Sequence, residues 1–147
     1  MERGFSGSVK SQKVNYVEYK NQDFNIFNIK LGEECFNKGE YETAIINFNQ
    51  ALQIKDDAEI YYKRGLSYYQ LGDYAAASAN YSQAIQLIFN DYQAYNKRGL
   101  ARYQLGNYQE AIEDYSQAIK INPHYADAYK NLININTYKA KALILCF

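Results

Sequence analysis

Histidine, cysteine and tryptophan are scarce or absent in this chain of 147 residues, which has one histidine, two cysteines and no tryptophan. The single histidine, His124, excludes a metal site with two histidines from one chain, and Cys35 and Cys146 lack the spacing of a metal-binding or redox motif. A glycine-rich phosphate loop followed by Lys-Ser/Thr is also missing. No nucleophile lies at a recognisable spacing from an orienting base. We therefore predict that the chain has no catalytic, cofactor-binding or metal site and is not an enzyme.

Net charge and long apolar runs are missing as well. Sixteen basic and sixteen acidic residues give a formal net charge of zero, so the chain lacks the electrostatic footprint of a general nucleic-acid binder. No stretch reaches the roughly 20 apolar residues that span a bilayer, and residues 1–10 lack the apolar run of a signal peptide. We expect no nucleic-acid partner and no membrane insertion. The two isolated cysteines favour a reducing compartment, so the expected location is cytoplasmic.

What the sequence does contain is a repeat. Nine residues recur with the same identity 34 positions later: Tyr61, Arg64, Gly65, Leu71, Gly72, Tyr74, Ala77, Tyr81 and Ala84 recur as Tyr95, Arg98, Gly99, Leu105, Gly106, Tyr108, Ala111, Tyr115 and Ala118. An earlier copy lies 33 residues before Gly65, Gly72, Tyr74, Ala77, Tyr81 and Ala84. Its residues are Gly32, Gly39, Tyr41, Ala44, Phe48 and Ala51. The missing residue is assigned to the connection after Ala51, because a loop tolerates a deletion better than a helix does.

The spacing of these residues resembles a known family. The run Tyr95-x2-Arg98-Gly99, then Ala111-x3-Tyr115, then Pro123 is similar to the tetratricopeptide repeat, a helix-turn-helix unit of 34 residues. The resemblance covers about residues 25–139. It implies an all-α fold, a right-handed α-α superhelix (solenoid) of three tandem helix-turn-helix repeats plus a C-terminal capping helix. The solenoid is expected over 25–147, with repeats at 25–57, 58–91 and 92–125 and a partial repeat at 126–147.

Several positions depart from the family pattern. The opening aromatic is Asn28 in the first unit, the closing proline is present only as Pro123, and the leucine before the helical glycine becomes Arg64 and Arg98 in the later units. We expect each arginine to cover apolar surface with its stem while its head remains in water. Acidic residues spaced three or four apart on the last repeat are predicted to share a solvated face: Glu110, Glu113 and Asp114.

Glycines at two recurring places predict the helix boundaries. One set lies where the chain must turn with positive φ: Gly39, Gly72 and Gly106. The predicted helix pairs are 26–37 with 41–54, 59–70 with 74–88, and 93–104 with 108–121. A second set lies inside the first helix of each pair, where glycine costs about 1 kcal/mol relative to alanine: Gly32, Gly65 and Gly99. We expect the two helices of a pair to approach closely there, against a facing alanine: Ala44, Ala77 or Ala111.

Both ends of the chain depart from the repeat. Residues 1–24 are predicted to be a disordered tail, and a strap lying across the binding groove is the alternative. Ile133 and Ala140 stand where the other units have glycine, so residues 127–143 are predicted to form one helix that caps the third repeat. The apolar residues 142–147 either pack back on the solenoid or leave a sticky end.

The resemblance implies that the first helices of the repeats form a concave wall that binds a ligand. The predicted peptide-binding groove comprises Lys30, Glu33, Tyr62, Lys63, Leu66, Tyr69, Gln70, Asn96, Lys97, Leu100, Tyr103, Gln104, Asn131 and Asn134. Lys30, Lys63 and Lys97 form a column that either attracts a carboxylate or only keeps the surface soluble. The seventeen tyrosines are interpreted as core residues first and ligand contacts second.

Some members of the family hold the C-terminal carboxylate of chaperones with a clamp of Lys, Asn, Asn, Lys and Arg. The matching positions here are Ile29, Glu33, Lys63, Gln93 and Lys97. Only Lys97 is chemically close to the clamp residue, and Glu33 has the opposite charge. We therefore predict no chaperone-tail clamp.

Taken together, these patterns predict a non-enzymatic scaffold for protein–protein interaction. The ligand is expected to be an extended or helical segment of a partner protein, held in the concave groove. One alternative is a self-assembling structural module that forms a homo-oligomer through residues 140–147. Another is a truncated repeat block of a larger protein.

Overall fold

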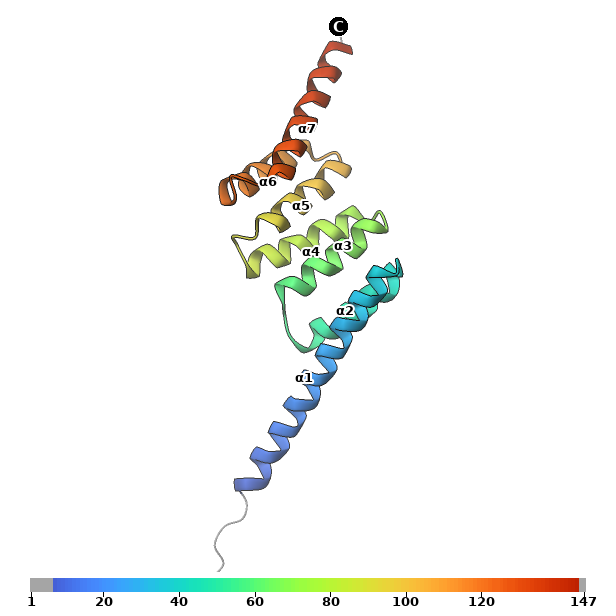
Figure 1. Ribbon diagram of the computed structural model, residues 1–147, viewed down its shortest axis with the longest axis vertical. Helices are drawn as coiled ribbons and strands as arrows, with labels where there is room; N and C mark the ends of the chain where they lie inside the picture. The colour runs from blue at the N-terminus through green and yellow to red at the C-terminus, as the bar shows by residue number, and fades with distance from the viewer. Residues whose placement is uncertain (1–6, 146–147) are drawn as a thin grey trace, which may run out of the picture. The chain divides into compact units, whose positions relative to one another are not determined.

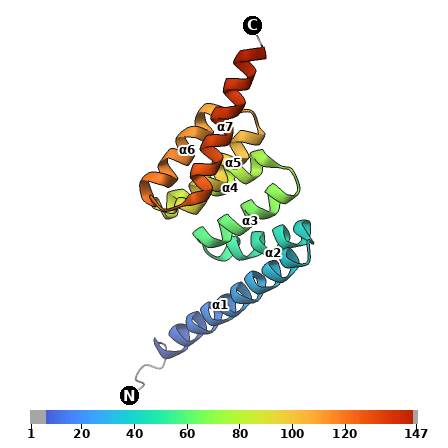
Figure 2. The ribbon, with the colours of Figure 1, turned by 45° about the horizontal axis from the view of Figure 1, so that its top comes forward.

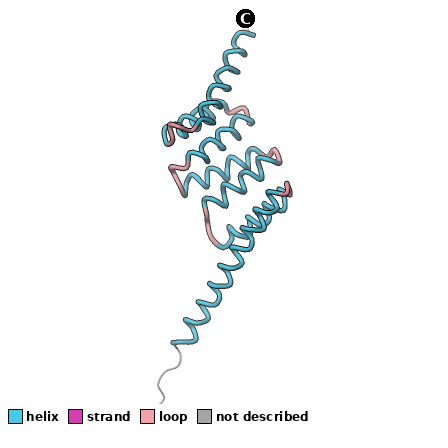
Figure 3. Tube along the Cα trace, viewed as in Figure 1, coloured by secondary structure: helices cyan, strands magenta, loops and turns pink. Residues whose placement is uncertain are grey.

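The computed structural model describes the backbone of residues 7–145 and the side chains of residues 20–141, 143 and 144. In this range the regular secondary structure is helical, with short connections between the helices (Figures 1 and 3). The helices are α1 (Gly7–Asn37), α2 (Tyr41–Ile54), α3 (Ala58–Gln70), α4 (Tyr74–Leu87), α5 (Tyr92–Gln104), α6 (Tyr108–Ile121) and α7 (Ala126–Leu145). The all-α prediction is confirmed.

The helices belong to two compact units, which divide between Asp56 and Asp57. The first unit contains α1 and α2, which pack against each other. In the second unit α3 packs on α4, α4 on α5, α5 on α6, and α7 on α6 and α5 (Figure 2). Within each unit, each helix therefore packs on its neighbour in the sequence, which is how stacked helix pairs bury an apolar face that no single pair can cover.

The turn inside each helix pair has the same backbone conformation. Gly39, Gly72 and Gly106 have φ angles of 80°, 80° and 81°, a region that glycine reaches without a Cβ penalty. Aspartate side chains accept hydrogen bonds from backbone N–H groups in the first turn of three helices. Asp73 begins α4 inside a pair, and Asp57 and Asp91 begin α3 and α5 between pairs. Apart from the start of α1, the predicted helix boundaries agree with the structure to within two residues.

The start of α1 differs from the prediction. The first helix was expected from residue 26 after a disordered tail, but α1 begins at Gly7 and continues without a break to Asn37. The physical reason lies in the residues between Ser8 and Leu31, which include neither proline nor glycine. Once the helix is nucleated by packing against α2, each further residue adds one hydrogen bond, and nothing in this stretch stops it. Residues 1–6 of the predicted tail lie outside the described range.

Each helix pair is built around one aromatic ring set among alanines. The recurring core residues are almost fully inaccessible, with exposed fractions of 0–1%: Ala44, Phe48 and Ala51, then Ala77, Tyr81 and Ala84, then Ala111, Tyr115 and Ala118. Four of the nine residues that recur at the 34-residue offset are buried in both copies, and three of these four are the alanines and the aromatic ring of this core. The interpretation that the repeated aromatics fill the space between helices is confirmed for these three rings.

The recurrent glycine of the first helix lies directly against this ring. A Cβ atom added at each glycine would meet the nearest ring atom at 2.6 Å for Gly32 and Phe48, 2.8 Å for Gly65 and Tyr81, and 2.6 Å for Gly99 and Tyr115. Such distances are well inside van der Waals contact. The predicted steric reason for glycine is confirmed, but its neighbour is the aromatic ring and not the facing alanine that was expected.

The last helix, α7, covers the end of the third pair. Ala128 and Ile135 on α7 are fully buried, and Ile135 joins a core cluster with Tyr115 of α6. The prediction of one continuous capping helix is confirmed. Leu143 and Ile144 remain 64% and 74% exposed, so these two residues do not pack back on the repeats.

Candidate functional site

In the second unit, α3, α5 and α7 are the first helices of their repeats. The sides of these three helices that carry the predicted groove residues form one continuous face. Tyr62 of α3 packs on a cluster that includes Ala94 of α5. Between α5 and α7, Asn131 Nδ2 donates a hydrogen bond of 2.9 Å to Asn96 Oδ1. We call this surface the first-helix face; it carries twelve of the predicted groove residues: Tyr62, Lys63, Leu66, Tyr69, Gln70, Asn96, Lys97, Leu100, Tyr103, Gln104, Asn131 and Asn134. The other two, Lys30 and Glu33, lie on α1 of the first unit.

The apolar part of the first-helix face is half-buried. Leu66 packs against the core around Tyr81, and Leu100 against the core around Tyr115, yet each keeps an accessible side. Half-buried aliphatic groups of this kind can bury further area on binding without first having to be ordered. They are the surface to which an apolar side chain of a ligand would bind.

Two of the predicted groove tyrosines are chiefly structural. Tyr69 lies against Tyr74 with ring centroids 5.0 Å apart, and Tyr103 lies against Tyr108 at 5.4 Å. Each pair joins the end of a first helix to the start of the second, across the glycine turn. Such aromatic pairs contribute about 0.5–1.5 kcal/mol beyond the area they bury. Removing either ring would disturb the fold as well as the face.

The lysines of the predicted column differ in their environments. Lys63 Nζ lies 2.7 Å from Glu59 Oε1, so most of its charge is compensated by a neighbour on the same helix. Lys97 is half-buried and has neither an ion-pair nor a hydrogen-bond partner among the residues whose side chains are described. Lys30 is exposed on α1. Of the two column lysines in the second unit, Lys97, beside Leu100, is therefore the one without a described partner.

A buried amide network holds the α5–α7 end of the face. Asn96 is only 2% exposed, donates from Nδ2 to the Tyr125 hydroxyl at 3.3 Å and accepts from Asn131. Asn96 was predicted as a ligand contact, but its hydrogen-bonding groups are engaged inside the protein. Its role is to position Asn131, which is half-buried.

A small pocket of about 260 Å³ opens at the N-terminal ends of α3 and α5. It is lined by Ala58, Glu59, Tyr62, Lys63, Ile88, Asp91 and Gln93. Burial is the main cause that raises the pKa of Tyr62 to about 12, and the nearby Tyr125 and Asp91 add to it. The phenol therefore stays neutral at physiological pH and can donate a hydrogen bond. The volume is smaller than the usual cofactor or drug site and suits one amino-acid side chain.

The remaining predicted groove residues differ in exposure. Gln70, Gln104 and Asn134 are exposed, whereas Glu33 of the first unit is half-buried. Amide side chains at such positions can pair with a peptide backbone as donors and as acceptors.

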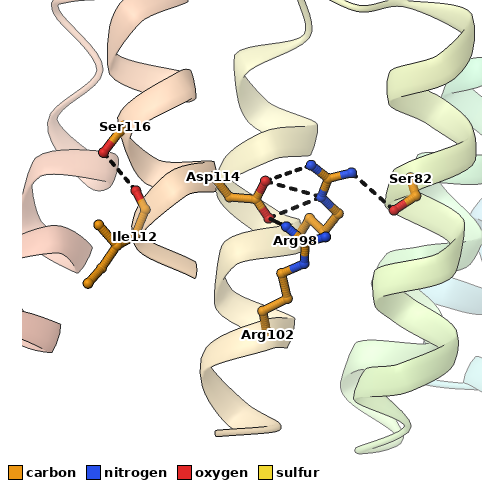
Figure 4. Close-up of polar contacts among 6 residues, drawn as sticks. All are labelled: Ser82, Arg98, Arg102, Ile112, Asp114 and Ser116. Carbon is orange, nitrogen blue, oxygen red and sulfur yellow. Dashed lines mark hydrogen bonds and ion pairs between the residues drawn. The ribbon is translucent and has the colours of Figure 1, made fainter. Parts of the chain in front are cut away.

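Sequence reasoning missed an ion-pair cluster behind the face (Figure 4). Arg98 of α5 and Asp114 of α6 form a bidentate pair, with Nη2 to Oδ1 at 2.6 Å and Nε to Oδ2 at 3.0 Å. Arg102 Nη1 adds a third contact to Asp114 Oδ2 at 2.8 Å. Arg98 Nη1 also donates to Ser82 Oγ of α4 at 3.1 Å. One arginine thus ties three successive helices together.

This cluster corrects two predictions. Asp114 was assigned to a solvated acidic face with Glu110 and Glu113, but its side chain is only 3% exposed, while the two glutamates are exposed as predicted. The Arg98 head was expected in water, but its side chain is 15% exposed and bonded on both sides. The error arose because the partners lie 16 residues apart, beyond the reach of spacing rules within one helix.

A sequence signal for the cluster exists in the preceding repeat. Arg64 Nε donates to Asn80 Oδ1 at 2.7 Å, again across 16 residues. Arg64 and Asn80 precede Arg98 and Asp114 by the repeat length. A recurrent arginine with a recurrent Asn or Asp at one fixed distance is the pattern that would have revealed the contact.

No group of three or more His, Cys, Asp or Glu side chains that could hold a metal ion occurs in the described part of the chain. Nor does any described helix combine the length and the apolar character needed to cross a bilayer.

Fold and face together define a repeat scaffold of stacked helix pairs. A sequence profile of the tetratricopeptide repeat matches residues 92–125, and a TPR repeat profile matches residues 32–72 and 65–106. Because the matched residues make up more than half of the sequence, the chain belongs to the tetratricopeptide repeat family. A comparison with curated proteins gave no match.

Solved structures of the same fold cover most of the chain. The first TPR of Spaghetti (RPAP3), bound to the HSP90 peptide SRMEEVD, is 24% identical, with a TM-score of 0.77, over 80% of this chain and 94% of that one. The second TPR domain of human RPAP3, in complex with the HSP70 peptide SGPTIEEVD, is 26% identical, with a TM-score of 0.75, over 79% and 98%. MamA is 23% identical, with a TM-score of 0.77, over 97% and 88%.

Proposed function

We propose that the chain is a protein-interaction module that binds a short extended or helical segment of a partner protein along the first-helix face. The observation that carries the proposal is the combination of half-buried Leu66 and Leu100 with the unpaired, half-buried Lys97 on a wall of packed helices. A rigid wall loses little conformational entropy on binding. The RPAP3 domains, which share the fold, are seen with bound peptides. TPR scaffolds are typically non-enzymatic, which agrees with this function.

The charges of the face select the ligand. With Lys63 paired to Glu59, Lys97 is the column lysine of the second unit whose charge a ligand can neutralise. The best segment has one carboxylate, from a side chain or a chain end, next to an aliphatic side chain that covers Leu100.

Replacing Lys97 tests the proposal. Random peptides displayed on phage are selected against the immobilised full chain, and the enriched peptides are synthesised. We expect Lys97→Ala to weaken their binding about fivefold, or about 1 kcal/mol, because a charged contact is lost at a half-buried site. Titration calorimetry measures the change. Lys120→Ala, on the exposed side of α6, is the matched control and should change the affinity less than about twofold. Equal affinities of the wild type and Lys97→Ala would contradict the proposal.

The chaperone-tail peptide gives a second, separate expectation. SRMEEVD ends in adjacent acidic groups, and the positions of the family clamp carry Ile29, Glu33 and Gln93 in place of cationic or amide donors of the right kind. We expect this peptide to bind the full chain more weakly than about 1 mM in fluorescence anisotropy. The matched variant Glu33→Asn should not restore tight binding, because Ile29 and Gln93 remain. Binding in the micromolar range would show that other cations replace the clamp.

A further inference from the structure

Helix α7 stands where a fourth helix pair would begin. Asn131 of α7 donates a hydrogen bond to Asn96 of α5, the first helix of the third pair, and Ile135 of α7 enters the core of that pair. At the repeat offset of 34 residues, Tyr129 corresponds to Tyr95, which is half-buried and packs against a cluster that includes Ala84 of α4 and Ala94 of α5. The face of α7 that would receive a second helix can therefore be compared position by position with α5.

That face is open. Tyr129 is 42% exposed and Ile133 is 64% exposed, although the residue that corresponds to Ile133 in α5 is the buried Gly99. The exposed residues continue along α7 at alternating spacings of four and three: Tyr129, Ile133, Asn136, Ala140 and Leu143. This alternation is the spacing of a seam that packs against another helix. Figure 1 shows α7 extending past α6 at the end of the second unit.

The charges beside this seam restrict what can cover it. Lys130 and Lys141 flank it and are exposed. With three lysines and one aspartate, α7 has a formal charge of +2. A second α7 in a symmetric dimer would bring the same lysines close together and offer one aspartate to them. An acidic helix would neutralise them, so charge complementarity favours a different partner over a second copy.

Sterics restrict the partner further. In each complete pair the second helix sends an aromatic ring onto the glycine of the first, at distances where even a Cβ atom collides with the ring. Ile133 fills that place on α7 with a branched side chain. We propose that the open face of α7 binds an acidic amphipathic helix of a partner protein that carries a small residue opposite Ile133, completing the fourth helix pair. This surface is distinct from the first-helix face, so the two proposals stand or fall separately.

The second helix of the third repeat supplies the probes. Two peptides have the sequence of residues 108–121 with two changes. Asp114→Ala removes the partner of Arg98, because α7 has Leu132 at the position of that arginine. Lys120→Glu makes the peptides more acidic. Both are held helical by a hydrocarbon staple, which uses no charged side chain, because short helices are marginal in water. One keeps the ring of Tyr115 and the other carries Tyr115→Ala. A third peptide, with Tyr115→Ala and lysine in place of every acidic residue, controls for charge.

The peptides are titrated into the ¹⁵N-labelled full chain, and chemical shifts are followed by NMR. We expect the acidic Tyr115→Ala peptide to bind about tenfold more tightly than the peptide with the ring, to shift amides of residues 126–145, and to lose its affinity when its acids become lysines. In the Ile133→Gly variant we expect the peptide that keeps the Tyr115 ring to bind more tightly than the Tyr115→Ala peptide, because glycine leaves room for the ring. Circular dichroism confirms that the variant, altered at an exposed position, keeps its helices.

Four outcomes would overturn the proposal. They are binding of neither acidic peptide, equal affinity of the two acidic peptides in the wild type, shifts centred on Leu66 and Lys97, and a dimer in sedimentation equilibrium that Ile133→Asp dissociates. The last would show that a second copy covers the seam.

Discussion

Asp114→Ala is expected to lower the free energy of unfolding by about 3–5 kcal/mol, the usual loss when one partner of a buried ion pair is removed. The Asp114 carboxylate is 3% exposed and receives both Arg98 and Arg102. Without it, two largely buried guanidinium groups keep their charge and lose their acceptor. Urea unfolding followed by circular dichroism measures the change.

Two matched variants separate the ion pair from the loss of a side chain on α6. Glu113→Ala removes the exposed neighbouring acid and should change stability by less than about 0.5 kcal/mol. Asp114→Asn should cost less than the alanine variant, because the Arg64–Asn80 contact shows that an amide can accept from the arginine of a repeat. If Asp114→Ala cost no more than Glu113→Ala, the cluster would not stabilise the stack.

Gly99→Ala is expected to destabilise the protein by about 1–3 kcal/mol, although the same change inside a helix normally stabilises by about 1 kcal/mol. The added Cβ would lie 2.6 Å from Tyr115 Cε1 and 3.2 Å from Asp114 Cβ. Tyr115 is 1% exposed, so its ring has little room to move. Thermal unfolding measures the effect.

A double-mutant cycle tests the cause of that loss. Tyr115→Leu shortens the group that faces Gly99 and lowers stability by itself, since it leaves a cavity. In that background, Gly99→Ala should be neutral or stabilising, because the obstacle is gone and the gain in helix propensity remains. A stabilising effect of Gly99→Ala in the wild type would contradict the close packing described here.

The sequence predicted the helix pairs well because their ends are determined by local chemistry. Gly39, Gly72 and Gly106 provide the positive φ of each turn, and the repeat offset assigns the same role to each. The start of α1 could not be predicted in the same way, since no glycine or proline between Ser8 and Leu31 enforces a helix boundary. A boundary is predictable where a residue enforces it.

The candidate site was predicted less completely, because a position on a helix face does not reveal its partners. Inward spacing predicts Lys97 and Leu100 on one surface, but it could not show that Lys63 is paired with Glu59 or that Asn96 is buried. Those facts depend on contacts between helices or on side-chain conformations. The Arg98–Asp114 pair is the clearest example, since it joins two helices across 16 residues.

Chemical-shift mapping is the most direct test of the central claim that the first-helix face binds a partner segment. A peptide selected against the full chain is titrated into the ¹⁵N-labelled protein. The account predicts that the largest shifts cluster on α3 and α5 around Leu66, Lys97 and Leu100, and that exposed positions of α6 such as Glu113 stay unchanged. Shifts concentrated on α4 and α6, with Lys97 and Leu100 unaffected, would contradict it.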